Sequence, residues 1–254
     1  MFIDTHTHLY DEELLKDETA MLQRASTAGV HKMYMPNCDS STIEGMMRLA
    51  KFYPDTCIPM MGLHPCYVKE NVADELAIVA QWLAKERFAA VGEIGLDYYW
   101  DLTFKEQQIA AFEQQIDWAI KYGLPIVIHS RESTSDCIDI VRRKQDGTLK
   151  GIFHCYSGTL VEAQQITELG LHLGIGGVIT YKKSTLPDVI REIPIQYLVL
   201  ETDAPYLAPV PYRGKRNESS YIPIIAAAIA DIKGLPVSEV AAITTHNAQN
   251  IFTI

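Results

Sequence analysis

The sequence has no long hydrophobic run and no pair of cysteines with metal-ligand spacing. No apolar stretch reaches the roughly 18 residues of a membrane span, and the chain does not open with a basic and then apolar signal segment. Its five cysteines are scattered and include no CxxC, which argues against a disulfide framework or a zinc ribbon. We therefore expect a cytoplasmic protein of a reducing compartment, with no membrane partner.

Basic residues are also scarce, since 22 Lys and Arg face 32 Asp and Glu and give a net charge of −10. A protein that coats duplex DNA usually carries a basic face, so this function is excluded. A nuclease is not excluded, because bound divalent cations offset local negative charge where a phosphate enters. The remaining composition is that of a globular protein.

Apolar runs alternate with segments of helical periodicity eight times along the chain. The runs are Phe2–Asp4, Lys32–Met35, Thr56–Gly62, Phe88–Ile94, Pro125–His129, Gly151–His154, Leu171–Ile175 and Tyr197–Glu201. Such alternation implies a parallel sheet. Eight units in 254 residues favour a single α/β domain over residues 1–254, a closed TIM (β/α)₈ barrel. An open, doubly wound sheet is the alternative.

Start and stop signals place the helices between these runs. A charged, periodic segment ends at Gly29, and Asp39 or Ser40 is expected to cap the next helix. Ser133 is a further candidate cap, and a helical segment is expected over Lys182–Glu192. The remaining helices are predicted at Val72–Lys85, Phe104–Tyr122, Leu160–Leu169, Tyr221–Ile232 and Val237–Ile251.

Two histidines follow the first strand, and side chains two apart on a strand point the same way. His6 and His8 can therefore reach one divalent metal. The pair alone is a moderate signal, since a His-x-His near a terminus often has no role.

Polar side chains also end most of the later strands. In a barrel these positions lie around one rim, where active sites are found. They are His64, Glu93, His129, His154, Glu201 and Asp203. A single histidine at a strand end is often structural, but several imidazoles and carboxylates on one rim indicate a site for Zn²⁺, Mn²⁺, Mg²⁺ or Fe²⁺. The histidines at positions 31, 172 and 246 are expected to be structural or on the surface.

Seven motifs, in order, resemble those of the TatD family of metal-dependent deoxyribonucleases, within the amidohydrolase-like barrels. They are DTHTHL from residue 4, GLHP from 62, GEIGLDYY from 92, HSRES from 129, HCYSG from 154, ETDAPYL from 201 and RGKRNE from 213. The closing THNAQNIF is similar to the last helix of the family. One departure is Ser219, where the family usually has proline after RGKRNE.

The resemblance implies two divalent metal ions, with Mg²⁺, Mn²⁺ and Zn²⁺ all compatible. His6, His8 and Asp203 would hold one ion, His129 and His154 the other, and Glu93 would bridge them. His64 and Glu201 would contact phosphate or orient a ligand. Four cationic side chains would hold the nucleic-acid backbone: Arg131, Arg213, Lys215 and Arg216.

The implied activity is 3′→5′ exonuclease cleavage of DNA, with a preference for single strands or nucleic-acid 3′ ends. We hypothesise that a metal-activated water attacks phosphorus in line, with Asp203 orienting or deprotonating it. Arg131 would stabilise charge on phosphorus, although a salt bridge is its ordinary alternative. A solvated charge run is the alternative for the RGKRNE loop, but its position after the last strand, beside Asp203, favours phosphate contact. Asp4 is expected to steady the ligands.

Two other functions stay open at this point. One is an amidohydrolase that acts on a small amide or on an aminoacyl ester of RNA, and the other is a metal-binding scaffold without catalysis. Glu93 stands where many binuclear amidohydrolases have a modified lysine, which favours the nuclease. We expect a monomer with no obligate protein partner.

Overall fold

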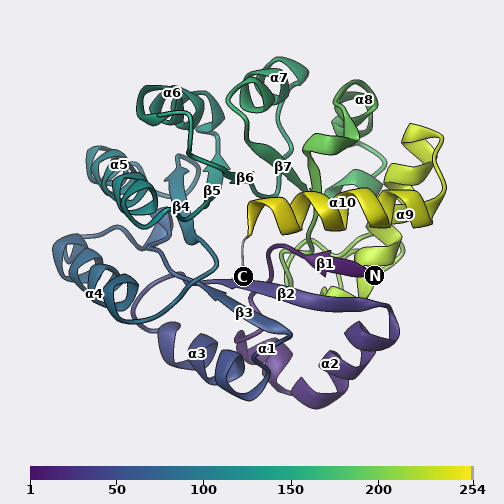
Figure 1. Ribbon diagram of the computed structural model, residues 1–254, viewed down its shortest axis with the longest axis horizontal. Helices are drawn as coiled ribbons and strands as arrows, with labels where there is room; N and C mark the ends of the chain where they lie inside the picture. The colour runs from purple at the N-terminus through teal and green to yellow at the C-terminus, as the bar shows by residue number, and fades with distance from the viewer. Residues whose placement is uncertain (253–254) are drawn as a thin grey trace.

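The computed structural model describes residues 1–252, and its short strands form a ring with helices outside (Figure 1). The strands are β1 (Phe2–Asp4), β2 (Val30–Pro36), β3 (Cys57–Met60), β4 (Val91–Asp97), β5 (Ile126–Arg131), β6 (Gly151–Phe153), β7 (His172–Ile175) and β8 (Leu198–Leu200). The α-helices are α1 (Glu12–Leu15), α2 (Glu18–Thr27), α3 (Ile43–Phe52), α4 (Val72–Lys85), α5 (Lys105–Tyr122), α6 (Thr134–Lys144), α7 (Leu160–Glu168), α8 (Leu186–Glu192), α9 (Ile222–Lys233) and α10 (Val237–Ile251). Short 3₁₀ turns are η1 (Pro65–Tyr67), η2 (Gly177–Thr180), η3 (Ile195–Tyr197) and η4 (Ser219–Tyr221).

The strands pair in parallel in chain order, β1 to β3 in one run and β4 to β8 in another. Backbone hydrogen bonds join the two runs at both ends. Met61 N donates to Ala90 O at 3.1 Å, and Gly92 N donates to Met61 O at 3.0 Å. On the other side, Thr5 N donates to Leu200 O at 3.0 Å. The ring is therefore closed, which confirms the predicted (β/α)₈ barrel.

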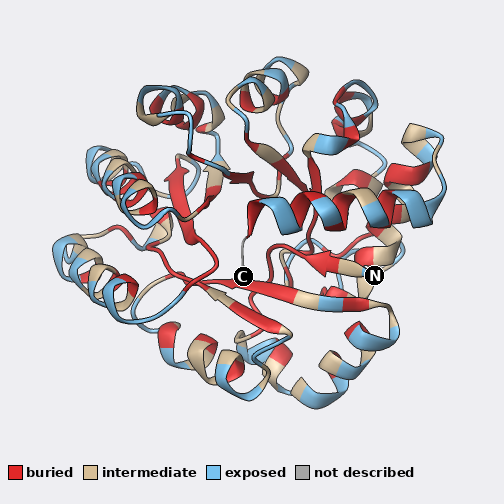
Figure 2. Cartoon of the chain, in the orientation of Figure 1, coloured by how far each residue is buried: buried red, intermediate tan, exposed pale blue. Residues whose placement is uncertain are grey.

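The barrel encloses its own apolar cluster. Its members come from strands all around the ring or the residues just before them, and from α10: Ile3, Tyr34, Ile58, Met60, Ala89, Ala90, Val127, Ile152, Val199, Ala248, Ile251 and Phe252. A second and larger cluster lies between the strands and the surrounding helices, which bury their inner faces and expose their outer ones (Figure 2). The strands are buried on both sides, as parallel strands of α/β proteins are.

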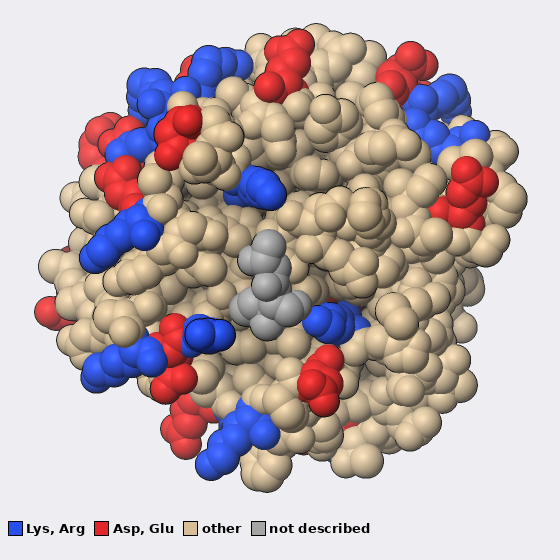
Figure 3. Space-filling model, viewed as in Figure 1, with Lys and Arg blue, Asp and Glu red and all other residues tan. Residues whose placement is uncertain are grey.

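Helix α10 closes one end of the barrel by crossing the starts of the strands (Figure 1). Asn247 Nδ2 donates to Ile195 O at 2.9 Å and to Leu198 O at 2.8 Å. The Phe252 ring, just beyond α10, stacks on Tyr34 with 4.4 Å between centroids. On this face, basic and acidic side chains are interspersed around the periphery (Figure 3). A site in this barrel must therefore open at the opposite end, where the strands finish.

The predicted helix ends are largely confirmed, with two differences. Helix α2 ends at Thr27, and Gly29 follows with φ +82°, a left-handed conformation that glycine adopts without strain. The segment before it holds two helices, α1 and α2. The helix expected from Lys182 begins only at Leu186.

The predicted helix caps are confirmed at one position only. Ser133 is the N-cap residue of α6, whereas neither Asp39 nor Ser40 caps α3. The amide and the hydroxyl of Ser40 both donate to the Glu75 carboxylate, at 2.9 and 2.8 Å. Helix α3 therefore begins after Thr42. Ser133 does precede α6, but its hydroxyl donates to Leu96 O at 2.7 Å and caps no helical amide.

Asp4 ties the end of β1 to the segment after β8 at the closed seam. It is fully buried, and its carboxylate accepts from Thr202 N at 3.0 Å, from Thr202 Oγ1 at 2.6 Å and from His6 N at 3.3 Å. Burial raises its pKa to about 7, despite these hydrogen bonds. Asp4 thus contacts the backbone of His6 and holds it beside the segment that carries Asp203.

We predict that Asp4→Ala lowers the free energy of unfolding by about 2–4 kcal/mol, because buried donors on Thr202 and His6 lose their acceptor. Chemical denaturation of the metal-free protein measures this. Asp188→Ala is the matched control, since Asp188 is exposed and pairs with Arg191 along α8, and we expect a change within about 0.5 kcal/mol. Equal stability of the two variants would contradict the prediction.

Candidate metal centre

Glu93, the third residue of β4, is surrounded by imidazoles at the open end of the barrel. Its side chain is buried, with 1% of the residue exposed. Carboxylate Oε1 lies 2.7 Å from His154 Nε2, 2.9 Å from His129 Nδ1 and 3.2 Å from His64 Nε2. A buried carboxylate is costly unless it is paired or bound to a cation, so this oxygen requires its neighbours.

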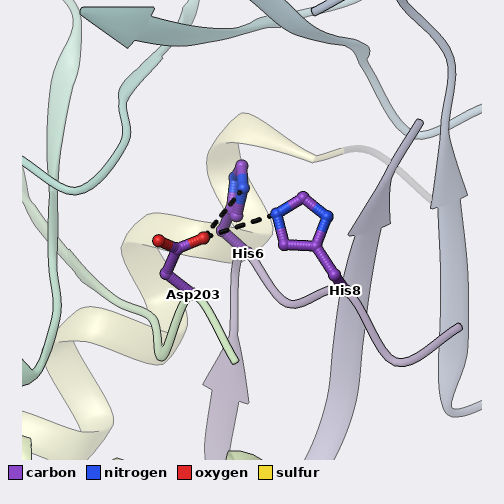
Figure 4. A group of neighbouring side chains, drawn as sticks. All are labelled: His6, His8 and Asp203. Atoms are coloured by element: carbon purple, nitrogen blue, oxygen red, sulfur yellow. Dashed lines mark ion pairs between the residues drawn. The ribbon is translucent and has the colours of Figure 1, made fainter. Parts of the chain in front are cut away.

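The other oxygen of Glu93 faces a second group of ligand atoms. Its Oε2 lies 3.1 Å from His6 Nε2. Asp203 Oδ1 completes the group, at 3.7 Å from His6 Nε2 and 3.4 Å from His8 Nε2 (Figure 4). Their ligand atoms, one each from His6, His8 and Asp203, lie close enough together to hold one metal ion.

The closed seam of the barrel brings this second group together. Thr7 bridges Ala204 in parallel, and Asp203 N donates to His6 O at 2.9 Å, so the residues after β1 and β8 run side by side. Asp203 has φ +57°, a left-handed conformation that aspartate adopts more readily than most residues. This turn lets its carboxylate point back toward His6 and His8.

The donor set fits divalent cations. Within the described residues, both ring nitrogens of His6, the Nδ1 of His154 and the Oε2 of Glu201 are buried without a hydrogen bond. His6 Nε2 lacks one even though a carboxylate oxygen lies 3.1 Å away. Imidazole nitrogens and carboxylate oxygens are ligands for Zn²⁺, Mn²⁺, Mg²⁺ or Fe²⁺. A cation beside Glu93 would satisfy the Nε2 of His6.

Two of the imidazoles are also oriented through the ring nitrogen that points away from the centre, as metal-ligating histidines usually are. Tyr10 OH lies 2.8 Å from His8 Nδ1 and itself donates to Pro36 O at 2.5 Å. His8 Nδ1–H is therefore the donor to Tyr10, which leaves its Nε2 lone pair facing Asp203. Asp97 Oδ2 lies 2.8 Å from His129 Nε2 and leaves that ring's Nδ1 facing Glu93.

Glu201 backs His154 in a similar way. One carboxylate oxygen lies 3.6 Å from His154 Nδ1 and accepts from Cys155 N at 2.5 Å. Gly174 makes room for it, since a Cβ there would lie 2.1 Å from the other Glu201 oxygen. Glycine at this position thus lets a buried carboxylate reach the back of the site.

Comparisons with known proteins identify the family of this chain. A family model described as TatD related DNase matches residues 3–253. The chain belongs to the TatD family. It is 36% identical, over the full length of both chains, to the uncharacterized metal-dependent hydrolase YabD of Bacillus subtilis. It is 30% identical to the 3′-5′ ssDNA/RNA exonuclease TatD of Erwinia tasmaniensis, over 99% of each chain.

A solved structure shows the same fold. The TatD homologue YjjV of Escherichia coli superimposes with a TM-score of 0.94 and 32% identity, covering 100% of this chain and 98% of the other. The protein is therefore a metal-dependent hydrolase of the TatD family. No helix in residues 1–252 is both long and apolar enough to cross a membrane.

His64 differs from the other imidazoles of this TatD-family site. Its Nδ1 accepts a hydrogen bond from Cys66 N at 3.0 Å, so the neutral ring carries its proton on Nε2. Burial lowers the pKa of His64, despite the nearby Glu93 charge, and favours that neutral ring. His64 Nε2 therefore faces Glu93 as a donor, which suits a hydrogen bond better than a metal bond.

The two carboxylates in the centre are ionised. Burial alone would raise the pKa of Glu93, but His154, His64 and His6 outweigh it and hold that pKa well below its ordinary value. Burial is likewise outweighed at Asp203, whose pKa is lowered mainly through its contact with His8. Both groups are thus anionic at neutral pH and suited to bind cations.

The predicted cationic residues lie in three different environments. Arg131 and Arg213 place their guanidinium carbons 3.7 and 4.5 Å from the centres of tyrosine rings. Lys215 is exposed. Arg216 instead donates to Asp17 at 2.6 Å, an ion pair that the sequence does not predict for this residue.

Sequence reasoning missed Asp97 and Tyr10, although a signal for Asp97 was present. Asp97 lies four residues after Glu93 on β4, hence on the same face of the strand. Gly95 lies between them, and a Cβ there would be 2.1 Å from His129 O. Tyr10 follows His8 by two residues, but it lies outside any strand, so only the structure shows its contact.

We predict that Tyr10→Phe and Asp97→Asn each weaken metal binding about 10- to 100-fold, because the imidazole they orient loses its partner. Competition with a chelator measures the affinity. Asp101→Asn is the control, because Asp101 pairs with Lys69 in an exposed loop and should leave the affinity unchanged. Wild-type affinity in both variants would contradict the role given to these partners.

We predict that His64→Gln keeps the full metal content of the wild type, whereas His129→Gln loses about one ion per chain. The reason is that the Nδ1 of His64 is occupied by the Cys66 amide, while Asp97 binds the Nε2 of His129 and leaves its Nδ1 to a metal. Elemental analysis of dialysed protein gives the count. Loss of an ion on replacing His64 would show that this ring is a ligand after all.

Proposed function

We propose that this protein is a deoxyribonuclease that removes nucleotides from single-stranded DNA in the 3′→5′ direction with two divalent cations. One observation carries the proposal: the two oxygens of Glu93 face two separate ligand groups. His6 with Asp203 lies on one side and His129 with His154 on the other. A single carboxylate between two such groups suits a two-ion centre, with Mg²⁺, Mn²⁺ or Zn²⁺ as the ions.

When bound, such cations would neutralise charge on a phosphodiester and make a water molecule easier to deprotonate. Asp203 is ionised and oriented by His8, so it is assigned to orient the attacking water and accept its proton. His64, whose Nε2–H faces Glu93, is assigned to orient that carboxylate between the two ligand groups. Glu201 acts through His154, which it holds in place.

Phosphate groups entering the site need cationic partners at the rim. Arg131, Arg213 and Lys215 are assigned to these contacts, because none of them forms an ion pair within residues 1–252. Arg216 is assigned to the loop itself, since Asp17 and Glu218 occupy its donors. The relative from Erwinia tasmaniensis, a protein named 3′-5′ ssDNA/RNA exonuclease, supports the same class of substrate.

The proposal is tested by a matrix of metals and substrates on protein stripped of metal. We expect Mg²⁺, Mn²⁺ or Zn²⁺ to restore cleavage of a single-stranded oligonucleotide, with products shortened from the 3′ end. An aminoacyl ester of RNA and a small cyclic amide are the competing substrates. Faster turnover of either one, with the oligonucleotide left intact, would overturn the proposal.

We predict that Asp203→Asn lowers the rate of oligonucleotide cleavage about 100-fold or more, because the attacking water loses its proton acceptor. The rate is measured at saturating metal, which separates the loss of the base from weaker metal binding. Asp188→Asn, on an exposed turn of α8, is the control and should cleave at the wild-type rate. An unchanged rate in Asp203→Asn would remove this residue from the mechanism.

A further inference from the structure

Two exposed aromatic rings and an arginine form a compact patch beside the metal centre. Tyr99 and Trp100 follow β4 and are 50% and 68% exposed. Their rings pack edge to face, with 4.8 Å between centroids. Arg131, the last residue of β5, lies across both, with its guanidinium carbon 3.7 Å from the Tyr99 centroid and 5.2 Å from that of Trp100.

One buried carboxylate connects this patch to the metal centre. Asp97 Oδ2 contacts His129, and its Oδ1 accepts from Tyr99 N at 3.0 Å and Trp100 N at 3.2 Å. Asp97 also pairs in register with Arg131. Arg131 lies two residues after His129 on β5, so both side chains leave the same face of the strand. The patch is thus held at a defined place on the rim.

The exposure of this patch has no structural explanation within the fold. The other two tryptophans, Trp82 and Trp118, are partly buried against the core, whereas the Trp100 ring is largely open to solvent. Within residues 1–252, Arg131 has no ion-pair partner, and its contacts are the two aromatic rings. Exposed aromatic faces beside an unpaired guanidinium are the usual means of binding unstacked bases.

We propose that Tyr99, Trp100 and Arg131 form a platform on which one nucleobase of a single strand stacks while a phosphate of that strand enters at Glu93. The inference rests on the proposed nuclease function and adds how that site selects single strands. Inside a duplex both faces of every internal base are covered by neighbours, and the terminal pair exposes one face only. A single strand therefore offers an unstacked base to the platform far more readily. Stacking is tolerant of sequence, because every base has a π face.

Further aromatic rings border the same opening. Tyr67 at the end of η1 lies 5.9 Å from the His64 ring, and Tyr206 after β8 lies 6.0 Å from the His8 ring, centroid to centroid. Both are more than 40% exposed. Aromatic rings from three loops around one mouth match a strand whose bases are splayed out more closely than a small amide.

The test compares thymidine strands with abasic strands of equal length, on the metal-loaded, full-length protein. Binding is followed by tryptophan fluorescence with strands whose phosphorothioate linkages slow cleavage, and kcat/KM is measured with ordinary linkages. We expect the wild type to bind and cleave the thymidine strand about 5- to 100-fold better than the abasic strand. Trp100→Ala should abolish this preference, and Trp100→Phe should retain most of it.

Phe52→Ala is the matched control, since Phe52 is 65% exposed but ends α3 at the opposite end of the barrel. It should keep the wild-type preference. If the wild type cleaves both strands equally well, the platform is refuted and the nuclease function stands. If the wild type cleaves neither strand, the nuclease function fails, and the fluorescence measurement then tests the platform. Quenching that is specific for thymidine strands and is lost in Trp100→Ala supports the platform. Equal quenching by thymidine and abasic strands refutes it.

Discussion

A buried carboxylate at the mouth of the barrel is the constraint on which the rest of this structure depends. Glu93 has almost no access to water, and neutral imidazoles cannot balance its charge alone. Several of them turn nitrogens toward it from four different strand ends, among them His6, His129 and His154. This arrangement is stable only with added positive charge, as protons or as metal ions. The unsatisfied nitrogens of His6 favour metal ions.

The remainder of the fold positions these side chains relative to one another. Helix α10 covers one end of the barrel, so the interior is apolar and the polar groups of the site lie at the other end. Asp4 joins the end of β1 to the segment after β8 by a hydrogen bond. This contact lies beside the ligand group that combines His6 and His8 with Asp203. Tyr10 and Asp97 then fix which nitrogen each imidazole presents. Packing, closure and hydrogen bonding thus act on the same few side chains.

The barrel and most of the centre were predictable because they follow from simple periodicities. Alternating apolar runs specify strands and helices, and polar residues at strand ends share one rim in a closed barrel. The predictions that failed concern residues whose partners are set by tertiary contacts. Ser40 bonds Glu75 instead of capping a helix, and Arg216 turns to Asp17. The tautomer of His64 depends on a backbone amide two residues away, which no pattern in the sequence reveals.

The partners behind the site were missed for the same reason. Asp97 lies on the predicted face of its strand, but its link to His129 requires the register between β4 and β5. That register also brings Arg131 over the rings of Tyr99 and Trp100. Pairing between strands is a tertiary property, so a single sequence leaves it open.

The central claim is that Glu93 bridges two ligand groups, each able to hold a metal ion. The most direct test counts the ions bound per chain in the wild-type protein, after saturation with Mn²⁺ or Zn²⁺ and removal of free metal. The account predicts two ions per chain. A single ion at saturation, or none, would contradict it.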